Sequence, residues 1–253
     1  MTYARNRETK KKRTDRKNTV GFSFENNLLE MPYKHSKIQT KKLIKPRTLN
    51  QSMFVESLKN NKITFGIGAA GCGKSLLAIH TGIVELNSEA SPIEKIIYVR
   101  ANVGCDDEND IGALPGELQD KVTPLAYPVY DNCREFMEDS AVKCLFEFEK
   151  IEVLPVAYLR GRSFANCFVI VDEAQNLTKT GMKTILTRMS HGSRLVLIGD
   201  PEQCDLREDR DMLWRVGVAL SDIDSIGFIP FGKEDILRDN LIHPILEKLK
   251  QVQ

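Results

Sequence analysis

Residues 68–75, with the sequence GAAGCGKS, have the types and spacing of a loop that binds phosphate groups. The loop follows the apolar run 63–67 and precedes a second apolar run at 76–79, so we predict that a strand enters it and a helix leaves it. Glycine allows backbone angles that side chains forbid, so several N–H groups can point at one phosphate, and the positive end of the helix dipole adds to their field. We expect Lys74 to reach the outer phosphates of a nucleotide and the Ser75 hydroxyl to bind Mg²⁺. The residues predicted to contact the nucleotide here are Gly68, Ala69, Ala70, Gly71, Cys72, Gly73, Lys74 and Ser75.

A pair of acids follows a second apolar strand, predicted at 167–171. Two adjacent carboxylates after a buried strand are unfavourable unless a cation lies nearby. We therefore predict that Asp172 holds Mg²⁺ through water and that Glu173 orients and deprotonates an attacking water. The alternative interpretation is an acid pair at the N-terminus of the helix expected at 178–189. Together with the phosphate-binding loop, the pair indicates hydrolysis of a nucleoside triphosphate.

A polar turn, Gly-Asp-Pro-Glu-Gln at 199–203, follows the next apolar strand. We predict that Gln203 lies beside the γ-phosphate and reports whether it is present. The alternative is a surface amide in a turn rich in Gly and Pro.

Strands and helices alternate along most of the chain. Alternation of this kind predicts an α/β fold in which a parallel sheet is covered by helices on both faces. We expect strands near 62–67, 95–99, 167–171, 194–198 and 225–229, and helices at 49–58, 75–87, 179–189 and 209–220.

The stretch 100–161 is less regular. It contains an acidic loop at 106–110, a helical region at 115–146 that we expect to break near Pro124 and Pro128, and a short strand at 151–154. We interpret this stretch as an insertion over the carboxyl edge of the sheet, where ligands bind in such folds.

Composition limits the class of protein. A chain of 253 residues with 42% hydrophobic residues can bury one large core, so one domain plus an extension fits best. No apolar run approaches the roughly 20 residues that a membrane span needs, and the N-terminus is charged without an apolar stretch behind it. We therefore expect a cytoplasmic protein with no membrane partner. The six cysteines form no CxxC pair and the four histidines are scattered, which argues against a disulfide framework or a zinc site.

Charge is distributed unevenly. The net charge is +1, but residues 1–49 hold 14 Lys and Arg against 4 acids, a balance of +10, and the remainder carries −9. We expect a basic, flexible N-terminal extension at 1–49 and a domain that hydrolyses nucleoside triphosphates at 50–253. Such an extension fits an arm for the phosphate backbone of a nucleic acid, and equally a disordered solubilising end.

Several of these motifs, in this order, resemble those of the PhoH-like ATPases, P-loop proteins similar to a single core of the superfamily 1 helicases and found in bacteria and many of their viruses. The resemblance covers about 50 to 250 and runs through NQ, ITFGIGAAGCGKS, YVR, LPGELQDKV, AYLRGRSF, FVIVDEAQN, MKTILTRM and GDPEQCDL. It implies a RecA-like P-loop NTPase fold. In that fold, the strand that leads to Gln203 lies between the strand that enters the phosphate-binding loop and the strand that precedes the acid pair. It also implies ATP and Mg²⁺ as ligands and the cytoplasm of a bacterial or virus-infected bacterial cell.

The resemblance also implies roles for residues that their own sequence context does not single out. Gln51, near the start of the first helix, would contact the adenine edge, although by itself it indicates a solvated helix start. Arg238 would match a catalytic arginine of the family, although here 239–242 separate it from His243-Pro244. Arg100, Arg160 and Arg188 would also have roles.

A single core supplies only half of a helicase ATP site. We therefore expect a homo-oligomeric ring, with six subunits by analogy with related ring ATPases. In it a neighbour's Arg238, Arg162 or Arg188 would stabilise the transition-state charge.

Three functions remain open. The first is Mg²⁺-dependent ATP hydrolysis coupled to binding, remodelling or unwinding of RNA or single-stranded DNA. The second is a thymidine-kinase-like phosphotransferase, whose family also joins a phosphate loop to an acidic strand end but usually adds a zinc ribbon. The third is a nucleotide-gated clamp on nucleic acid with little turnover.

Overall fold

The computed structural model describes residues 37–101, 118–159, 161–206, 212–237 and 248. The chain divides after Ser36, and the compact unit that carries the described residues begins at Lys37. The unit that carries the sheet therefore takes in residues 37–49, which the sequence assigned to the extension. The flexibility expected of 1–36 falls on residues outside the described ranges.

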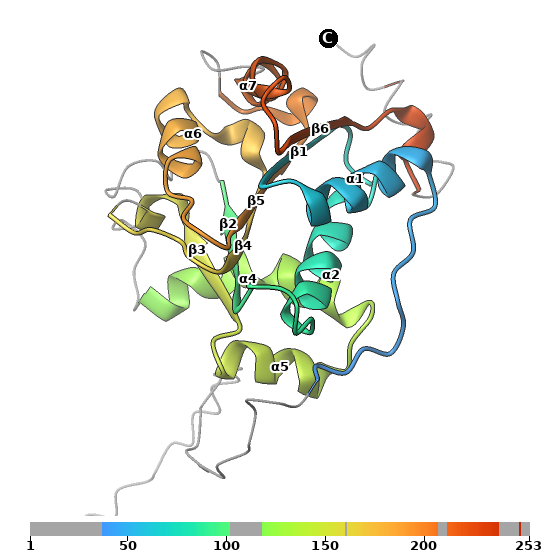
Figure 1. The fold of residues 1–253 in the computed structure, drawn as a ribbon, viewed down its shortest axis with the longest axis vertical. Helices are drawn as coiled ribbons and strands as arrows, with labels where there is room; N and C mark the ends of the chain where they lie inside the picture. Colours follow the sequence, from blue (N-terminus) through green and yellow to red (C-terminus); the bar gives the residue numbers. More distant parts are fainter. Residues whose placement is uncertain (1–36, 102–117, 160, 207–211, 238–247, 249–253) are drawn as a thin grey trace, which may run out of the picture. The chain divides into compact units, whose positions relative to one another are not determined.

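Within the described ranges, six parallel strands form a single sheet with the order β3-β2-β4-β5-β1-β6 (Figure 1). The expected strands are all present, and β5 lies between β1 and β4, as the resemblance implied. Neighbouring strands end close to the same level, since Ile67 pairs with Gly199 and Val171 with Leu197. The strands are β1 (Ile63–Ile67), β2 (Lys95–Arg100), β3 (Ile151–Pro155), β4 (Cys167–Asp172), β5 (Arg194–Gly199) and β6 (Ile226–Pro230).

The inner strands are buried on both faces, as parallel strands require. Along β4, Phe168 and Ile170 belong to one hydrophobic cluster, whereas Val169 and Val171 belong to the other. Alternation of side chains along a strand explains this division. Each large apolar side chain that is fully buried contributes about 1.5–3 kcal/mol. The two clusters therefore hold the strand ends, and the loops that follow them, in fixed positions.

Helices cover each face of the sheet. One cluster contains residues of α1 (Leu49–Asn60), α2 (Lys74–Leu86), α4 (Leu118–Arg134) and α5 (Asp139–Glu147). The opposite cluster contains residues of α6 (Lys179–Leu186) and α7 (Met212–Leu220). This arrangement confirms the prediction of a sheet covered on both sides.

Helices α4 and α6 depart most from the prediction. Helix α6 ends three residues before the expected 189, because Met189 instead forms a parallel bridge with Phe164. The predicted break near Pro124 and Pro128 is wrong, because α4 continues through both prolines. Val129 and Cys133, which follow them on α4, are buried in the core, and this packing holds the helix where local propensity would end it.

In its described part, the irregular stretch 100–161 therefore supplies the edge strand β3 and the helices α4 and α5. These helices cover the same face of the sheet as α2. The acidic loop expected at 106–110 lies outside the described residues. No helix among the described residues combines the length and the apolar character needed to cross a membrane.

Residues 37–48 run along the surface of the same unit (Figure 1). Asn87 at the end of α2 exchanges two hydrogen bonds with the backbone of Ile38, at 2.8 and 2.9 Å. Further along, the Lys41 N–H donates to Phe136 O at 2.8 Å, and the Ile44 N–H donates to His80 Nε2 at 3.2 Å. These contacts lead the segment to Thr48, the N-cap of α1.

Candidate nucleotide site

The glycine loop joins β1 to α2 in the conformation that its sequence predicts. Gly73 has φ 75° at the N-terminus of α2, and Gly68 has φ 154°. A Cβ atom on Gly68 would lie 2.5 Å from the carbonyl oxygen of Phe231, in the segment after β6. Only glycine therefore fits where the loop begins.

Lys74 is nearly buried within this loop. Its ammonium donates to Gly68 O at 2.6 Å and to Ala69 O at 2.8 Å, and Nζ lies 5.9 Å from the centre of the Phe231 ring. Burial lowers the pKa of Lys74, while neighbouring acidic groups, including Asp200, act in the opposite sense. The ammonium is thus held at the loop by groups that leave it weakly solvated.

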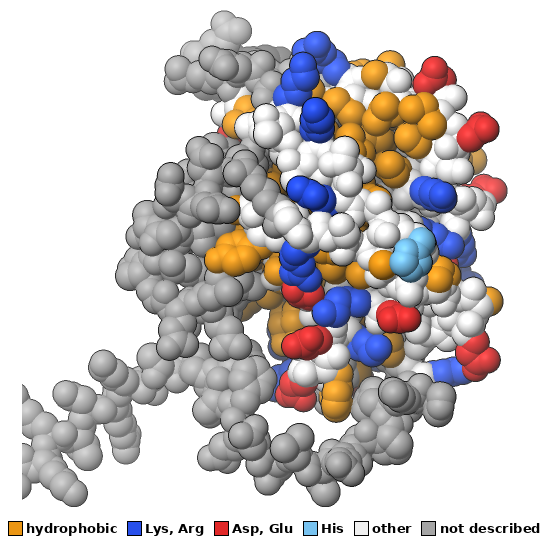
Figure 2. All heavy atoms as spheres, turned by 60° about the vertical axis from the view of Figure 1, so that its left-hand side comes forward, with side chains coloured by type: hydrophobic (Ala, Val, Ile, Leu, Met, Phe, Trp, Pro, Cys, Tyr) orange, Lys and Arg blue, Asp and Glu red, His pale blue; other side chains and the backbone are white. Residues whose placement is uncertain are grey.

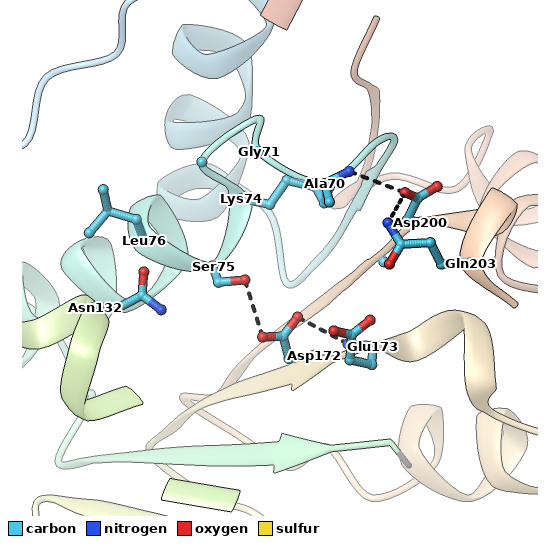
Figure 3. Close-up of a pocket in the computed structure, with 12 residues that line it drawn as sticks. Ala70, Gly71, Lys74, Ser75, Leu76, Asn132, Asp172, Glu173, Asp200 and Gln203 are labelled. Carbon is cyan, nitrogen blue, oxygen red and sulfur yellow. Dashed lines mark hydrogen bonds between the residues drawn. The ribbon is translucent and has the colours of Figure 1, made fainter. Parts of the chain in front are cut away.

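Asp172 ends β4, and its side chain is hydrogen-bonded to Ser75 at the start of α2. Its Oδ2 accepts a hydrogen bond from Ser75 Oγ at 3.1 Å (Figure 3). The same oxygen accepts another from the Tyr98 hydroxyl at 2.5 Å. Burial, followed by the charge of Asp172, raises the pKa of Tyr98 well above its ordinary value, so Tyr98 remains a donor. The first acid and the phosphate-binding loop thus lie in direct contact. The sequence analysis gave no role to Tyr98, which contacts Asp172 from the neighbouring strand β2.

Glu173 occupies a backbone conformation that is unusual for a residue with a side chain, with φ 55° and ψ 34°. Strain of this kind persists only where the surroundings fix it. The carboxylate accepts a hydrogen bond from Gln175 Nε2 at 2.8 Å and lies 3.7 Å from the guanidinium of Arg100. Gln175 is only 3% exposed, and its Oε1 accepts the N–H of Asp200 at 3.0 Å. A buried amide therefore connects the second acid to the end of β5.

Asp200 and Gln203 close the opposite side of the site. Asp200 Oδ2 accepts the N–H of Ala70 at 3.1 Å and the side-chain amide of Gln203 at 2.7 Å (Figure 3). Sequence reasoning assigned a role to Gln203 but none to Asp200. The signal that could have found Asp200 is an acid directly after a buried strand, the same pattern that identified Asp172.

These groups surround a pocket of about 280 Å³. The predicted residues that line it come from the loop, the acidic strand and the β5 turn, so the structure brings these three segments together. Leu76, Gly199, Asp200 and Asn132 of α4 are additions. Among the described residues, the lining consists of Ala70, Gly71, Gly73, Lys74, Ser75, Leu76, Asn132, Asp172, Glu173, Gly199, Asp200 and Gln203.

Four of the predicted nucleotide contacts are not among the described residues that line the pocket: Gln51, Gly68, Ala69 and Cys72. The interpretation of Gln51 as a solvated helix start is wrong, because Gln51 is 3% exposed. Its Nε2 donates to Cys72 O at 2.9 Å, and its Oε1 accepts the Arg47 N–H at 2.7 Å. Gln51 thus holds the phosphate-binding loop through its hydrogen bond to the backbone of Cys72. Burial raises the pKa of the Cys72 thiol, which is fully enclosed.

The arginines expected to have roles at the site are described only in part. Arg238 and Arg160 fall outside the described residues. Arg162 forms two hydrogen bonds to Glu152 of β3, at 2.9 and 3.3 Å, which raise the pKa of its guanidinium. Arg188 has a buried Nε atom without a hydrogen-bond partner in the structure. Among the described residues that line the pocket, none is an arginine.

The donor set suits Mg²⁺. A serine hydroxyl and a carboxylate supply hard oxygen ligands, and Mg²⁺ in nucleotide sites usually takes one or two protein ligands with phosphate and water. Within the described ranges there is no cluster of three or more His, Cys, Asp or Glu that could hold a metal ion by itself.

Comparison with known proteins identifies the family of this chain. Residues 43–250 match the model of the PhoH-like protein family. A PhoH-like protein of Synechocystis is 36% identical over 84% of this chain, one of Bacillus subtilis is 37% identical over 81%, and Protein PhoH of Escherichia coli is 35% identical over 76%. The aligned region covers 64%, 64% and 54% of those relatives, so the chain spans between half and two thirds of their length. The large terminase of a thermophilic bacteriophage aligns over 80% of this chain and 50% of its own, at 10% identity and TM-score 0.48, which is too weak to indicate function.

The parallel sheet, the glycine loop and the acidic strand end define a nucleotide-binding domain of the P-loop class, with the RecA-like α/β fold. The chain belongs to the PhoH family.

Replacement of Gly68 tests the packing that shapes the loop. We expect Gly68→Ala to lower the free energy of unfolding by more than about 2 kcal/mol, because it combines backbone strain with a collision against Phe231. Gly161→Ala is the control, because Gly161 has φ 76° with no atom within 4 Å of an added Cβ, and should lose only about 1 kcal/mol. Urea denaturation measures both. Equal losses would contradict the importance of the Phe231 contact.

Proposed function

We propose that this chain binds ATP with Mg²⁺ and hydrolyses the γ-phosphate, and that it couples this cycle to work on RNA or single-stranded DNA. The observation that carries the ATPase proposal is the hydrogen bond of 3.1 Å between Ser75 and Asp172. It joins the phosphate-binding loop to the acidic strand end, so that a single Mg²⁺ and triphosphate can contact both. Family membership supports the same class of activity.

Each side chain has a role that its position allows. The Lys74 ammonium would bind phosphate oxygens in place of the carbonyls it now contacts, and Ser75 and Asp172 would hold Mg²⁺. The cation neutralises phosphate charge when bound. Glu173 would accept the proton of the attacking water, with its carboxylate oriented by Gln175. Gln203 would lie beside the γ-phosphate, since it lines the pocket next to the loop.

A neighbouring subunit would supply the missing arginine. The absence of arginine from the described pocket lining supports a ring of identical chains, six by analogy, in which Arg238, Arg162 or Arg188 reaches the next site. Arg162 would have to exchange its bond to Glu152 for this. Hydrolysis per chain should then rise with chain concentration, whereas full activity from a demonstrated monomer would refute the ring.

Nucleic acid is the proposed polymer because cations gather in two parts of the chain. Besides the basic extension, residues 178–194 carry Lys179, Lys183, Arg188 and Arg194 and no acid. Arg194 is paired with Glu85, whereas Lys183 is exposed on α6. Figure 2 shows Lys and Arg side chains spread down the side of the molecule that includes α6 in Figure 1, with acids mainly lower down and along its right edge. Phosphate backbones bind surfaces of this kind.

Steady-state hydrolysis tests the ATPase proposal. We expect Lys74→Ala to abolish turnover by weakening nucleotide binding, and Glu173→Gln to lower kcat at least about 100-fold while ATP still binds. Glu56→Gln on the exposed face of α1 is the matched control and should match the wild type. Phosphate release is measured with and without RNA and single-stranded DNA. A wild-type rate equal to that of Lys74→Ala would refute the proposal.

The same variants separate the alternatives. A clamp with little turnover would keep its nucleic-acid binding cycle in Glu173→Gln, and a thymidine-kinase-like enzyme would release ADP in the presence of a nucleoside without any nucleic acid.

Salt dependence tests the basic extension. We expect the affinity for a single-stranded RNA oligonucleotide to fall at least about tenfold between about 50 and 200 mM salt, because bound cations are released from phosphates. Replacing Lys10, Lys11, Lys12 and Arg13 by Gln should reduce both the affinity and the salt slope. Arg at all four positions is the control that keeps the charge. An affinity that does not change with salt concentration would contradict a role of the extension in binding nucleic acid.

A further inference from the structure

Asp235 has a fully buried carboxylate outside the pocket. It belongs to the short helix η4 (Lys233–Asp235) after β6, and it is 0% exposed. Its Oδ2 accepts hydrogen bonds from Asn50 Nδ2 and from the Gly232 N–H, both at 2.8 Å, and its Oδ1 accepts one from the Thr48 hydroxyl. Burial by itself raises the pKa of this carboxyl, but the bonds from Asn50, Thr48 and Gly232 outweigh it and hold the pKa below its ordinary value. Three donors therefore stabilise a buried anion.

Thr48 connects this anion to the first turn of α1. A hydroxyl has one proton, and Thr48 donates it to Asp235, so its oxygen accepts the Gln51 N–H, at 3.2 Å, through a lone pair. This second bond caps α1. Asp235 thus fixes the direction in which the capping hydroxyl points.

Gln51 carries the connection to the phosphate-binding loop. Its Nε2 donates to Cys72 O at 2.9 Å, and it lies so close to the loop that a Cβ on Gly73 would be 3.3 Å from Nε2. A second connection leaves from the other side of Asp235, where the Leu237 N–H donates to Gly71 O at 3.2 Å. Residues 71–73 of the loop are therefore held by two groups whose positions depend on Asp235.

We propose that Asp235 is a positioning residue for the nucleotide site, which holds residues 71–73 in the conformation that receives phosphates, through Thr48 and Gln51 on one side and Leu237 on the other. This inference rests on the proposed function. Asp235 does not line the pocket. Glu173 and Gln175 have their hydrogen bonds at the ends of β4 and β5, away from this network. Loss of the carboxylate should therefore weaken nucleotide binding more than it slows the chemical step.

Asp235→Asn and Thr48→Val test the connection at its two ends. Asparagine keeps an oxygen for Asn50 and Gly232 but turns an NH₂ group toward the Thr48 hydroxyl, and valine removes that hydroxyl with little change of shape. We expect each variant to raise KM for ATP about tenfold, equivalent to about 1.4 kcal/mol, with kcat changed less than about threefold. Thr48→Ser keeps the hydroxyl and is the matched control, expected within about twofold of the wild type. The double variant should resemble the single ones, because each substitution removes the same connection between Asp235 and Thr48.

The outcomes separate this inference from the proposed function. KM values within about twofold of the wild type in both folded variants, or an equal loss in kcat with unchanged KM, would overturn the role of Asp235. Circular dichroism melts check folding, and Thr48→Val, which leaves two donors on the carboxylate, carries the test if Asp235→Asn does not fold. A wild-type chain that binds a fluorescent ATP analogue without hydrolysing ATP refutes only the ATPase proposal, and Kd for the analogue then replaces KM. A wild type that binds no nucleotide refutes both.

Discussion

The site depends on one constraint: β1, β4 and β5 end at the same edge of the sheet, with β5 between β1 and β4. The loop after β1, the acids after β4 and the turn after β5 then meet at one edge of the sheet. Ser75 and Asp172 are 97 residues apart in sequence, yet their side chains are 3.1 Å apart. Two hydrophobic clusters, one on each face, hold the strands in this register. The nucleotide site is thus a consequence of parallel strand order and of what each strand carries at its carboxyl end.

Polar side chains within the fold extend this arrangement beyond direct contacts. Gln175 connects Glu173 to Asp200, and Asp200 connects β5 to the N–H of Ala70. A separate network behind the loop runs from Asp235 to Cys72 through Thr48 and Gln51. Buried polar groups are expensive unless they are bonded, so each network restrains its members to a narrow set of positions. The pocket is therefore shaped from the hydrolytic side and from the loop side by different residues.

The sequence predicted the features that local patterns encode. Apolar runs indicated the six described strands. The spacing of GAAGCGKS indicated the phosphate-binding loop, because its glycines and Lys74 lie within eight consecutive residues. Features that depend on distant contacts were missed. The continuity of α4 through two prolines depends on Val129 and Cys133 packing into a core that distant segments build, and a window of residues around the prolines does not reveal those partners. Asp235 contacts Thr48 across 187 residues, and Tyr98 contacts Asp172 across 74, so neither role can be derived from spacing along the chain.

The central claim is that the phosphate-binding loop and the β4 acids share one metal and one nucleotide. Affinity for Mn²⁺ in the presence of a slowly hydrolysed ATP analogue, measured by electron paramagnetic resonance, tests it most directly. We expect one Mn²⁺ for each bound nucleotide, and at least about tenfold weaker Mn²⁺ binding in both Asp172→Asn and Ser75→Ala, with nucleotide still bound. Mn²⁺ affinity that is the same in Asp172→Asn as in the wild type would contradict the account.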